Sequence, residues 1–562
     1  MTLSDKYRTL QRQVITTYSN PDLNGVLDIA PADFGMPDKF TAWRPGQYGA
    51  VNSVLESEER FNGICAPTGW GKSLFYMAMA KLSGKRTVIL TSTKGLQDQL
   101  LEDFNAISTD IRGMANYTCP VAADFDLPSG TVVNDAPCQC GYSCPLRSGG
   151  CNYFDVFNTA CSADIVVTNY QCWMYDQRRG QKGFAATRPV DILVLDEAHD
   201  APEQLASYLQ TELDRNECLS LGITWPLSGY TNDDWRLWGI HWRDQFEERI
   251  DELTERIKLG EGDRKRLLRE VRECRRIFRR LQRVAVVNDD WIVQEGVGMR
   301  SVRFDPLWPK RYAESALFRR VPKVVLVSAT LRPKTAMLLG VPTTDSMSFL
   351  EFNSSFPPAS RPVIHVPTVR MNWRNERDDD KMAWWLRKLD LILATRGDRK
   401  GIIHTVSYKR ARFILDNSKY ASRMMIHGSA DRRWLIERFK SAPMGAILLS
   451  PSVGTGYDFI GDLAEYQIIS KLPFPDTRDQ VIKERSRQDP DYQPYLVAQT
   501  LQQMTGRIVR SEWDRGETII LDDNVQWFVK RYKSHFNRWW LQAYSKWEGT
   551  APPPPLEKLE VA

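Results

Sequence analysis

Residues 66–73 have the composition and spacing of a phosphate-binding loop. The sequence Ala-Pro-Thr-Gly-Trp-Gly-Lys-Ser follows an apolar run and precedes a helical stretch, residues 74–82. At such a strand–turn–helix junction, backbone N–H groups and the helix dipole face phosphate oxygens. A lysine then reaches the outer phosphates, and a serine hydroxyl can ligate Mg2+. The loop therefore predicts an ATP site whose contacts are Ala66, Thr68, Gly69, Gly71, Lys72 and Ser73.

Two acids end a second apolar run at Asp196 and Glu197, followed by Ala198 and His199. An aspartate at a strand tip can hold Mg2+ opposite Ser73, and the neighbouring glutamate can orient or deprotonate the attacking water. A lone Asp-Glu pair means little. After a phosphate loop, however, it indicates a nucleoside triphosphatase in which Lys72, Asp196 and Glu197 are catalytic.

Two further stretches could complete this site. Arg44-Pro-Gly-Gln47 lies about 20 residues before the loop, and a glutamine amide can pair with the donor and acceptor of an adenine edge. The alternative is a surface glutamine after a turn. Gln503, Arg507 and Arg510 are spaced by four and three residues, so they share a helix face. The arginines could reach across a cleft to the γ-phosphate, although surface arginines are also common.

Five of the ten cysteines fall between residues 119 and 151. In a reducing compartment, such a cluster favours a metal over disulfides. Four thiolates can hold either Zn2+ or a 4Fe-4S cluster, and spacing alone does not choose between them. A zinc module usually shows two C-x2-C pairs, which are absent. The candidate ligands are Cys119, Cys138, Cys140, Cys144 and Cys151.

Short apolar runs separated by helical stretches predict parallel sheets covered on both faces. A proline-rich, charged stretch near residues 355–380 predicts a boundary between two such α/β units. Apolar stripes on both sides of Gly260–Asp263 predict an antiparallel helical hairpin with Asp263 as an N-cap. The second stripe comprises Leu267, Val271, Cys274, Phe278 and Leu281. The second helix is rich in arginine, which suits either a solvated face or a nucleic-acid path.

The chain has 562 residues and a net charge of +5, so only local patches could attract a polyanion. No apolar run reaches the roughly 18 residues of a membrane span. We expect a cytoplasmic protein, or one in the host cytoplasm if viral, without a membrane partner.

The ordered motifs resemble superfamily 2 helicases, and within them the iron–sulfur, DEAH-box XPD/DinG-like family. The motifs are Arg44–Gln47, Ala66–Ser73, Asp196–His199, Ser328–Leu331, Gly456-x-Asp458, Lys471–Phe474 and Gln503–Arg510. One departure is Thr455, where the family commonly has Glu. The resemblance implies two RecA-like lobes, with iron–sulfur and helical arch insertions in the first.

The implied domains are 1–110, 161–200 and 321–355 for lobe 1, 111–160 for the iron–sulfur domain, 201–320 for the arch, 356–550 for lobe 2 and 551–562 for a disordered tail. The resemblance favours a 4Fe-4S cluster on Cys119, Cys138, Cys144 and Cys151, with Cys140 spare or replacing Cys138. It also adds Gly456 and Asp458 to the ATP site and Gln503 to the catalytic set.

By this resemblance, the protein is expected to be a monomeric ATP-dependent DNA helicase. It would move 5′ to 3′ on single-stranded DNA and act on forked or tailed duplexes. Lys94, Gln97, Asn169, Tyr170, Thr405 and Tyr408 follow strand ends and are candidate DNA contacts. Two alternatives remain: an RNA-directed or non-unwinding nucleoprotein-remodelling translocase, and a zinc-stapled nucleic-acid-binding scaffold without turnover.

Overall fold

A computed structural model of the chain describes residues 30–125, 127–177, 180–342, 347–426, 428, 432–450, 463–509 and 513–557. Three predicted site residues, Gly456, Asp458 and Arg510, lie outside the described residues, as does Thr455.

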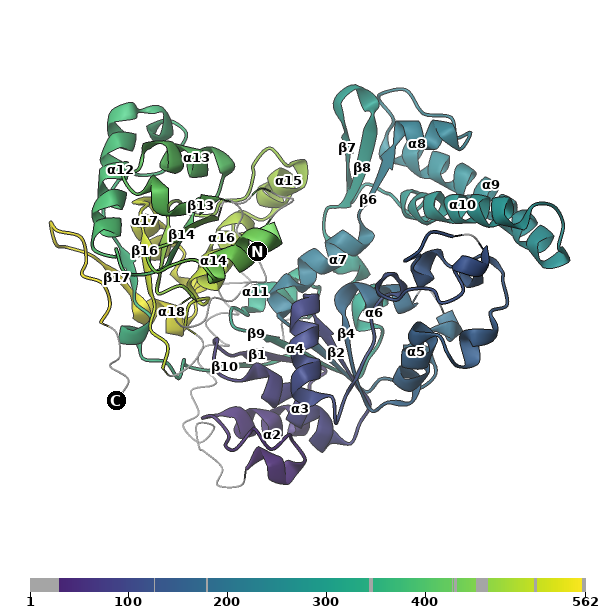
Figure 1. Cartoon of the computed structure of the whole chain (residues 1–562), viewed down its shortest axis with the longest axis horizontal. Helices are drawn as coiled ribbons and strands as arrows, with labels where there is room; N and C mark the ends of the chain where they lie inside the picture. The colour runs from purple at the N-terminus through teal and green to yellow at the C-terminus, as the bar shows by residue number, and fades with distance from the viewer. Residues whose placement is uncertain are drawn as a thin grey trace.

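Lobe 1 is built on a seven-stranded parallel sheet in the order β10-β1-β9-β5-β2-β4-β3. Its strands are β1 (Phe61–Cys65), β2 (Thr87–Thr91), β3 (Thr109–Asp110), β4 (Ile165–Asn169), β5 (Ile192–Asp196), β9 (Lys323–Ser328) and β10 (Met347–Glu351). The central strands are buried on both faces, because α3 (Lys72–Ser83) and α4 (Lys94–Phe104) pack on one face of the sheet, while α6 (Tyr170–Gln177) and α7 (Ala201–Leu209) pack on the other (Figure 1). The predicted α/β fold is confirmed.

Lobe 2 contains a second seven-stranded parallel sheet in the order β13-β14-β12-β15-β16-β11-β17. Its strands are β11 (Val363–His365), β12 (Gly401–His404), β13 (Met424–Ile426), β14 (Ile447–Ser450), β15 (Tyr466–Ile469), β16 (Glu517–Ile520) and β17 (Tyr544–Lys546). Its helices include α12 (Asp379–Ala394), α13 (Tyr408–Asn417), α15 (Gln480–Gln488), α16 (Tyr492–Thr505) and α17 (Asn524–Arg531). The two sheets form separate bodies in Figure 1.

A projecting unit lies between β5 and β9 in the chain. Its stem is an antiparallel sheet of β6 (Thr211–Asp214), β8 (Ser301–Pro306) and β7 (Trp291–Glu295), which the sequence did not predict. The predicted hairpin is present as α9 (Asn232–Leu259) and α10 (Arg264–Val284), and the Asp263 side chain caps α10 as expected (Figure 1). Ile277, rather than Phe278, is fully buried in the seam. No helix in the described ranges is long and apolar enough to cross a membrane.

Residues 111–160 form a run of short 3-10 helices followed by α5 (Asn152–Ser162). This segment contacts the tip of the hairpin. The Arg264 guanidinium lies 5.1 Å from the ring centroid of Phe125 and 5.0 Å from that of Tyr142. A Cβ at Gly141, where φ is +96°, would lie 2.8 Å from a methyl carbon of Thr254, so this approach requires glycine. The segment and the hairpin therefore pack together.

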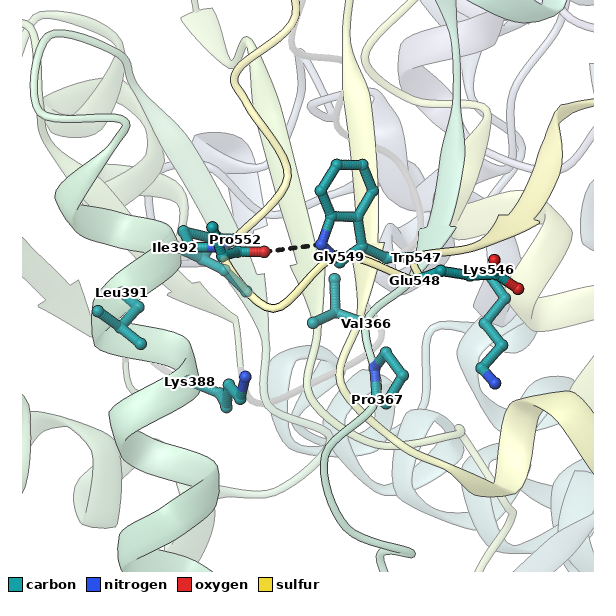
Figure 2. A pocket seen from close by; sticks show the side chains of 11 residues that line it. Val366, Pro367, Lys388, Leu391, Ile392, Lys546, Trp547, Glu548, Gly549 and Pro552 are labelled. Carbon is teal, nitrogen blue, oxygen red and sulfur yellow. Dashed lines mark hydrogen bonds between the residues drawn. The ribbon is translucent and has the colours of Figure 1, made fainter.

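The C-terminal segment lies against lobe 2. The Trp547 indole donates to the carbonyl of Ala551 over 2.7 Å, beside a cavity of about 300 Å³ that Figure 2 shows. The buried Arg396 guanidinium donates to the carbonyl of Pro553. The predicted disorder of residues 551–562 is therefore wrong for 551–557, because side chains of the lobe satisfy the carbonyls of this proline-rich segment.

Candidate functional site

The phosphate-binding loop joins β1 to α3, as predicted. Gly69 and Gly71 both have left-handed φ values, +80° and +83°. A Cβ at Gly69 would lie 2.0 Å from the ring of Phe356, and one at Gly71 would lie 2.3 Å from Nε2 of Gln47. Both positions therefore require glycine, for conformation and for space. Lys72 begins α3, which leaves the helix N-terminus at the loop.

Gln47, the first residue of α2 (Gln47–Glu56), is hydrogen-bonded to this loop. Its side chain is buried, and its Nε2 donates to the carbonyls of Trp70, at 2.7 Å, and Gly71, at 3.1 Å. Its Oε1 accepts from the backbone N–H of Arg44 at 2.6 Å. Both the N–H group and the oxygen of the Gln47 amide are thus hydrogen-bonded within the protein. The contact between Gln47 and adenine stays a prediction, and it would require adenine to replace these protein partners.

Asp196 lies fully buried at the end of β5. Among the described residues, its Oδ1 has no hydrogen-bond partner, while its Oδ2 lies 3.4 Å from the Tyr76 hydroxyl. Burial, followed by the charge of Glu197, raises the pKa of Asp196 to about 7. The same Tyr76 hydroxyl lies 3.4 Å from Oγ of Ser73. The Tyr76 hydroxyl thus links Ser73 to Asp196, and these two side chains offer the oxygen ligands that Mg2+ prefers.

Sequence reasoning missed Tyr76. It follows Ser73 by three residues on α3, and this spacing places both on one helix face. The sequence could have given this signal, but not the proximity to Asp196.

Glu197 lies beside both Lys72 and His199. Its backbone is left-handed, with φ of 46°, and its Oε1 lies 3.5 Å from the Lys72 ammonium. Its Oε2 lies 3.2 Å from Nδ1 of His199 and accepts from the Ser328 hydroxyl at 3.4 Å. Burial opposes protonation of His199, but the carboxylates of Asp200 and Glu197 prevail and raise its pKa. The predicted catalytic acid is therefore part of a polar network.

This network crosses from lobe 1 to lobe 2. Nε2 of Gln503, on α16, donates to the Thr330 hydroxyl over 2.7 Å and lies 3.4 Å from Nδ1 of His199. Arg507 lines an interlobe cavity of about 460 Å³ together with His199 and Gln503. Side chains more than 300 residues apart in sequence thus meet at one cleft, as expected for a site completed by both lobes.

Comparison with known proteins agrees with this geometry. Residues 40–224 match the family model described as "Type III restriction enzyme, res subunit", and residues 394–543 match the "Helicase C-terminal domain". "ATP-dependent DNA helicase YoaA" of Haemophilus influenzae is 24% identical, over 85% of this chain and 90% of that protein. YoaA of Escherichia coli is 22% identical over the same shares. A solved structure titled "XPD_Helicase" has a TM-score of 0.59 at 14% identity, covering 89% of this chain and 99% of the other.

The chain is therefore similar to ATP-dependent DNA helicases in sequence, and it shares the fold of the XPD helicase structure.

A second large cavity, of about 1010 Å³, lies on the lobe 1 side of the helicase. It is lined by the hairpin, by lobe 1 and by seven residues of the cysteine-rich segment: Ile111, Gly113, Met114, Ala115, Asn116, Asn134 and Gln139. Five arginines of α10 face it: Arg275, Arg276, Arg279, Arg280 and Arg283. Arg276 and Arg280 pair with Glu217. The ion pairs of the described residues do not include Arg275 or Arg279. Two acids of α9, Glu247 and Asp251, line the same side, so the five arginines outnumber the acids there and the hairpin side is basic on balance.

The candidate DNA contacts had mixed outcomes. Gln97, Tyr170 and Thr405 are fully buried and hydrogen-bonded inside their lobes, so these three predictions are wrong. Lys94 and Asn169 line the 1010 Å³ cavity, and Tyr408 is exposed on lobe 2. These three stay predictions of DNA contact.

Four cysteines of residues 111–160 lie near one another. Burial raises the pKa of the Cys138 thiol, and the charges of Cys119, Cys144 and Cys151 raise it further. In contrast, Cys140 faces the hairpin, since the charges of Arg275 and Arg272 act on its thiol. Among the described residues, no three His, Cys, Asp or Glu side chains are arranged as a metal site. A thiolate-bound cluster on Cys119, Cys138, Cys144 and Cys151 therefore stays a prediction.

Proposed function

We propose that this helicase couples Mg-ATP hydrolysis between its lobes to 5′-to-3′ movement along single-stranded DNA, and that this movement separates the strands of forked or tailed duplexes. The observation that carries the proposal is the continuous contact from Glu197 through His199 to Gln503 across the cleft. It gives lobe 2 a means of sensing the hydrolytic residue of lobe 1. The polarity, the monomeric state and the cytoplasmic location follow from resemblance and composition, and remain predictions.

At the ATP site, Lys72 would exchange its contact with Glu197 for the outer phosphates, which frees Glu197 to take the proton of the attacking water. Ser73 and Asp196 would hold Mg2+, which supplies positive charge next to the phosphate oxygens when bound. Arg507 and Arg510 would neutralise charge from the lobe 2 side. Gly456 and Asp458 are proposed to complete the site.

The single strand would pass through the 1010 Å³ cavity. Arg275 and Arg279 face this space, and the burial that lowers the pKa of Arg279 also makes an anionic partner favourable. Sequence-independent contact with phosphates suits a motor that must step along any sequence.

Cys119, Cys138, Cys144 and Cys151 would hold a 4Fe-4S cluster. When bound, the cluster would fix a segment that has little regular structure of its own. Cys140 is not proposed as a ligand, because it is buried toward Arg272 and Arg275.

The proposal is tested with tailed duplexes of DNA and RNA, each with a 5′ or a 3′ single-stranded tail. Only the 5′-tailed DNA duplex should separate, and only with ATP and Mg2+. Unwinding only from the 3′ tail would overturn the polarity. Equal action on RNA would favour an RNA-directed translocase, and colourless, zinc-containing protein without turnover would favour a scaffold.

The DNA path is tested with the double variant Arg275→Ala/Arg279→Ala. Losing two phosphate contacts should weaken binding to single-stranded DNA and reduce the slope of log K against log salt by about 1.4. Arg269→Ala is a matched control, because Arg269 is an exposed residue of the same helix that does not line the cavity. A salt slope unchanged in the double variant would contradict the path.

A further inference from the structure

Residues 366–378 join β11 to α12 along the carboxyl edge of the lobe 2 sheet. Strands β11, β16, β15 and β12 run parallel, so their carboxyl ends share this edge. Open α/β sheets bind ligands outside these ends. The segment is attached at two points, because the Asp522 carboxylate accepts from the backbone N–H of Met371 at 3.0 Å and the Asp523 carboxylate accepts from that of Thr368 at 2.7 Å.

This rigid segment exposes a tryptophan. The indole of Trp373 is 66% accessible to solvent. The guanidinium carbon of Arg377 lies 3.7 Å from its ring centroid, a stacked cation–π geometry. Because the lobe covers little of the Trp373 ring, the ring is available to stack on a second planar group, and the attached backbone keeps it in position.

The charge around Trp373 indicates the chemistry of that partner. Within residues 370–377, the arginines Arg370, Arg374 and Arg377 are exposed. The one acid of this stretch, Glu376, accepts from Lys471 at 2.6 Å and pairs with Arg410 at 2.7 Å. Asp378, Asp379 and Asp380 follow at the start of α12, where Asp378 pairs with Lys381. The three exposed arginines before them form a cationic stretch beside the indole, which suits a polyanion rather than a basic protein surface.

We propose that Trp373 is a stacking platform for a base of single-stranded DNA on lobe 2, with Arg377 fixing the ring and Arg370 and Arg374 facing the backbone phosphates. Bases stack on aromatic side chains without regard to sequence, as this motor requires. Tyr408 begins α13, whose Arg410 contacts the same segment, so the platform lies beside a predicted DNA contact. The inference rests on the proposed function, since it assumes a DNA substrate.

The test compares wild type, Trp373→Ala and Trp373→Phe in the binding of a fluorescently labelled oligodeoxyadenylate, and of the same oligomer made fully abasic. The loss of one stacked base should weaken binding of the oligodeoxyadenylate by about 5-fold to 150-fold in Trp373→Ala. Trp373→Phe should retain most of the affinity. On the abasic strand, wild type and Trp373→Ala should bind alike, and hydrolysis of ATP without DNA should not change.

Trp384→Ala is the matched control. Trp384 is also exposed, and Nζ of Lys388 lies 4.9 Å from the centroid of its ring, so it has a similar cation–π contact. It lies at a different place on lobe 2, because Lys388 lines the cavity beside the C-terminal segment (Figure 2). Equal loss on normal and abasic strands, or no loss in Trp373→Ala, would overturn the platform. If Trp373→Ala binds normally while Arg275→Ala/Arg279→Ala binds weakly, only this inference fails. If wild type binds neither strand, the proposed function fails.

Discussion

Replacement of Lys334 by methionine should destabilise the protein strongly. Lys334, on α11 (Pro333–Leu338) of lobe 1, pairs with Asp489 at the end of α15 in lobe 2. The exposed fraction is 2% for Lys334 and 5% for Asp489. Removing one partner of such a pair leaves an unpaired buried charge and costs about 3–5 kcal/mol. For a cooperative unit of lobe size, this predicts a fall in Tm of roughly 6–20 °C.

The assay is thermal unfolding followed by circular dichroism at fixed pH and salt. Lys334→Met/Asp489→Asn should recover much of the loss, because it removes both charges while Asn can still accept from the N–H of Asp491. Lys381→Met, which breaks an exposed pair with Asp378, should leave Tm unchanged. A fall below 2 °C in Lys334→Met, or equal falls in the single and double variants, would refute the reasoning.

Three further outcomes are expected. Burial lowers the pKa of His404 to about 4, below its unfolded value of 6.5. The neutral imidazole therefore contributes stability above pH 6.5, and the free energy of unfolding should fall by about 3 kcal/mol as the pH drops from 6.5 toward 4. In urea unfolding of wild type and His404→Gln across this range, the free energy of unfolding should depend less on pH in the variant. Cys151→Ser should abolish bound iron and the brown colour, whereas Cys140→Ser should retain both; equal iron in the two variants would contradict the ligand assignment. Tyr76→Phe should raise the Mg2+ concentration for half-maximal ATP hydrolysis several-fold, because the Tyr76 hydroxyl lies next to both Ser73 and Asp196. Tyr170→Phe is the control, because it loses only a bond to the backbone carbonyl of Asp196 and should leave that concentration unchanged. Identical dependence of hydrolysis on Mg2+ in wild type and Tyr76→Phe would exclude a role for Tyr76.

The parallel sheets and the helical hairpin were predictable because their signals are local. Buried parallel strands appear as apolar runs, and the hairpin shows stripes with a cap at Asp263. The stem strands were missed because β6 (Thr211–Asp214) and β8 have only four and six residues, and because they pair with each other across the whole hairpin rather than with a neighbour in sequence. The C-terminal segment was mistaken for disorder because its partner, Arg396, is about 157 residues away.

The candidate site was predictable in its residue types and not in its contacts. Lys72, Asp196 and Glu197 were identified from motifs, but the bond between Gln503 and Thr330 depends on how two lobes meet. Position after a strand does not decide whether a side chain points inward, which is why the buried Tyr170 was mistaken for a DNA contact.

Strand separation by wild type and Glu197→Gln on a 5′-tailed DNA duplex is the most direct test of the central claim, that hydrolysis at this cleft drives movement on DNA. Glu197→Gln should bind ATP and single-stranded DNA like wild type, hydrolyse ATP about 10²–10⁴-fold more slowly and separate almost no strands. Equal strand separation by the two proteins would contradict the account.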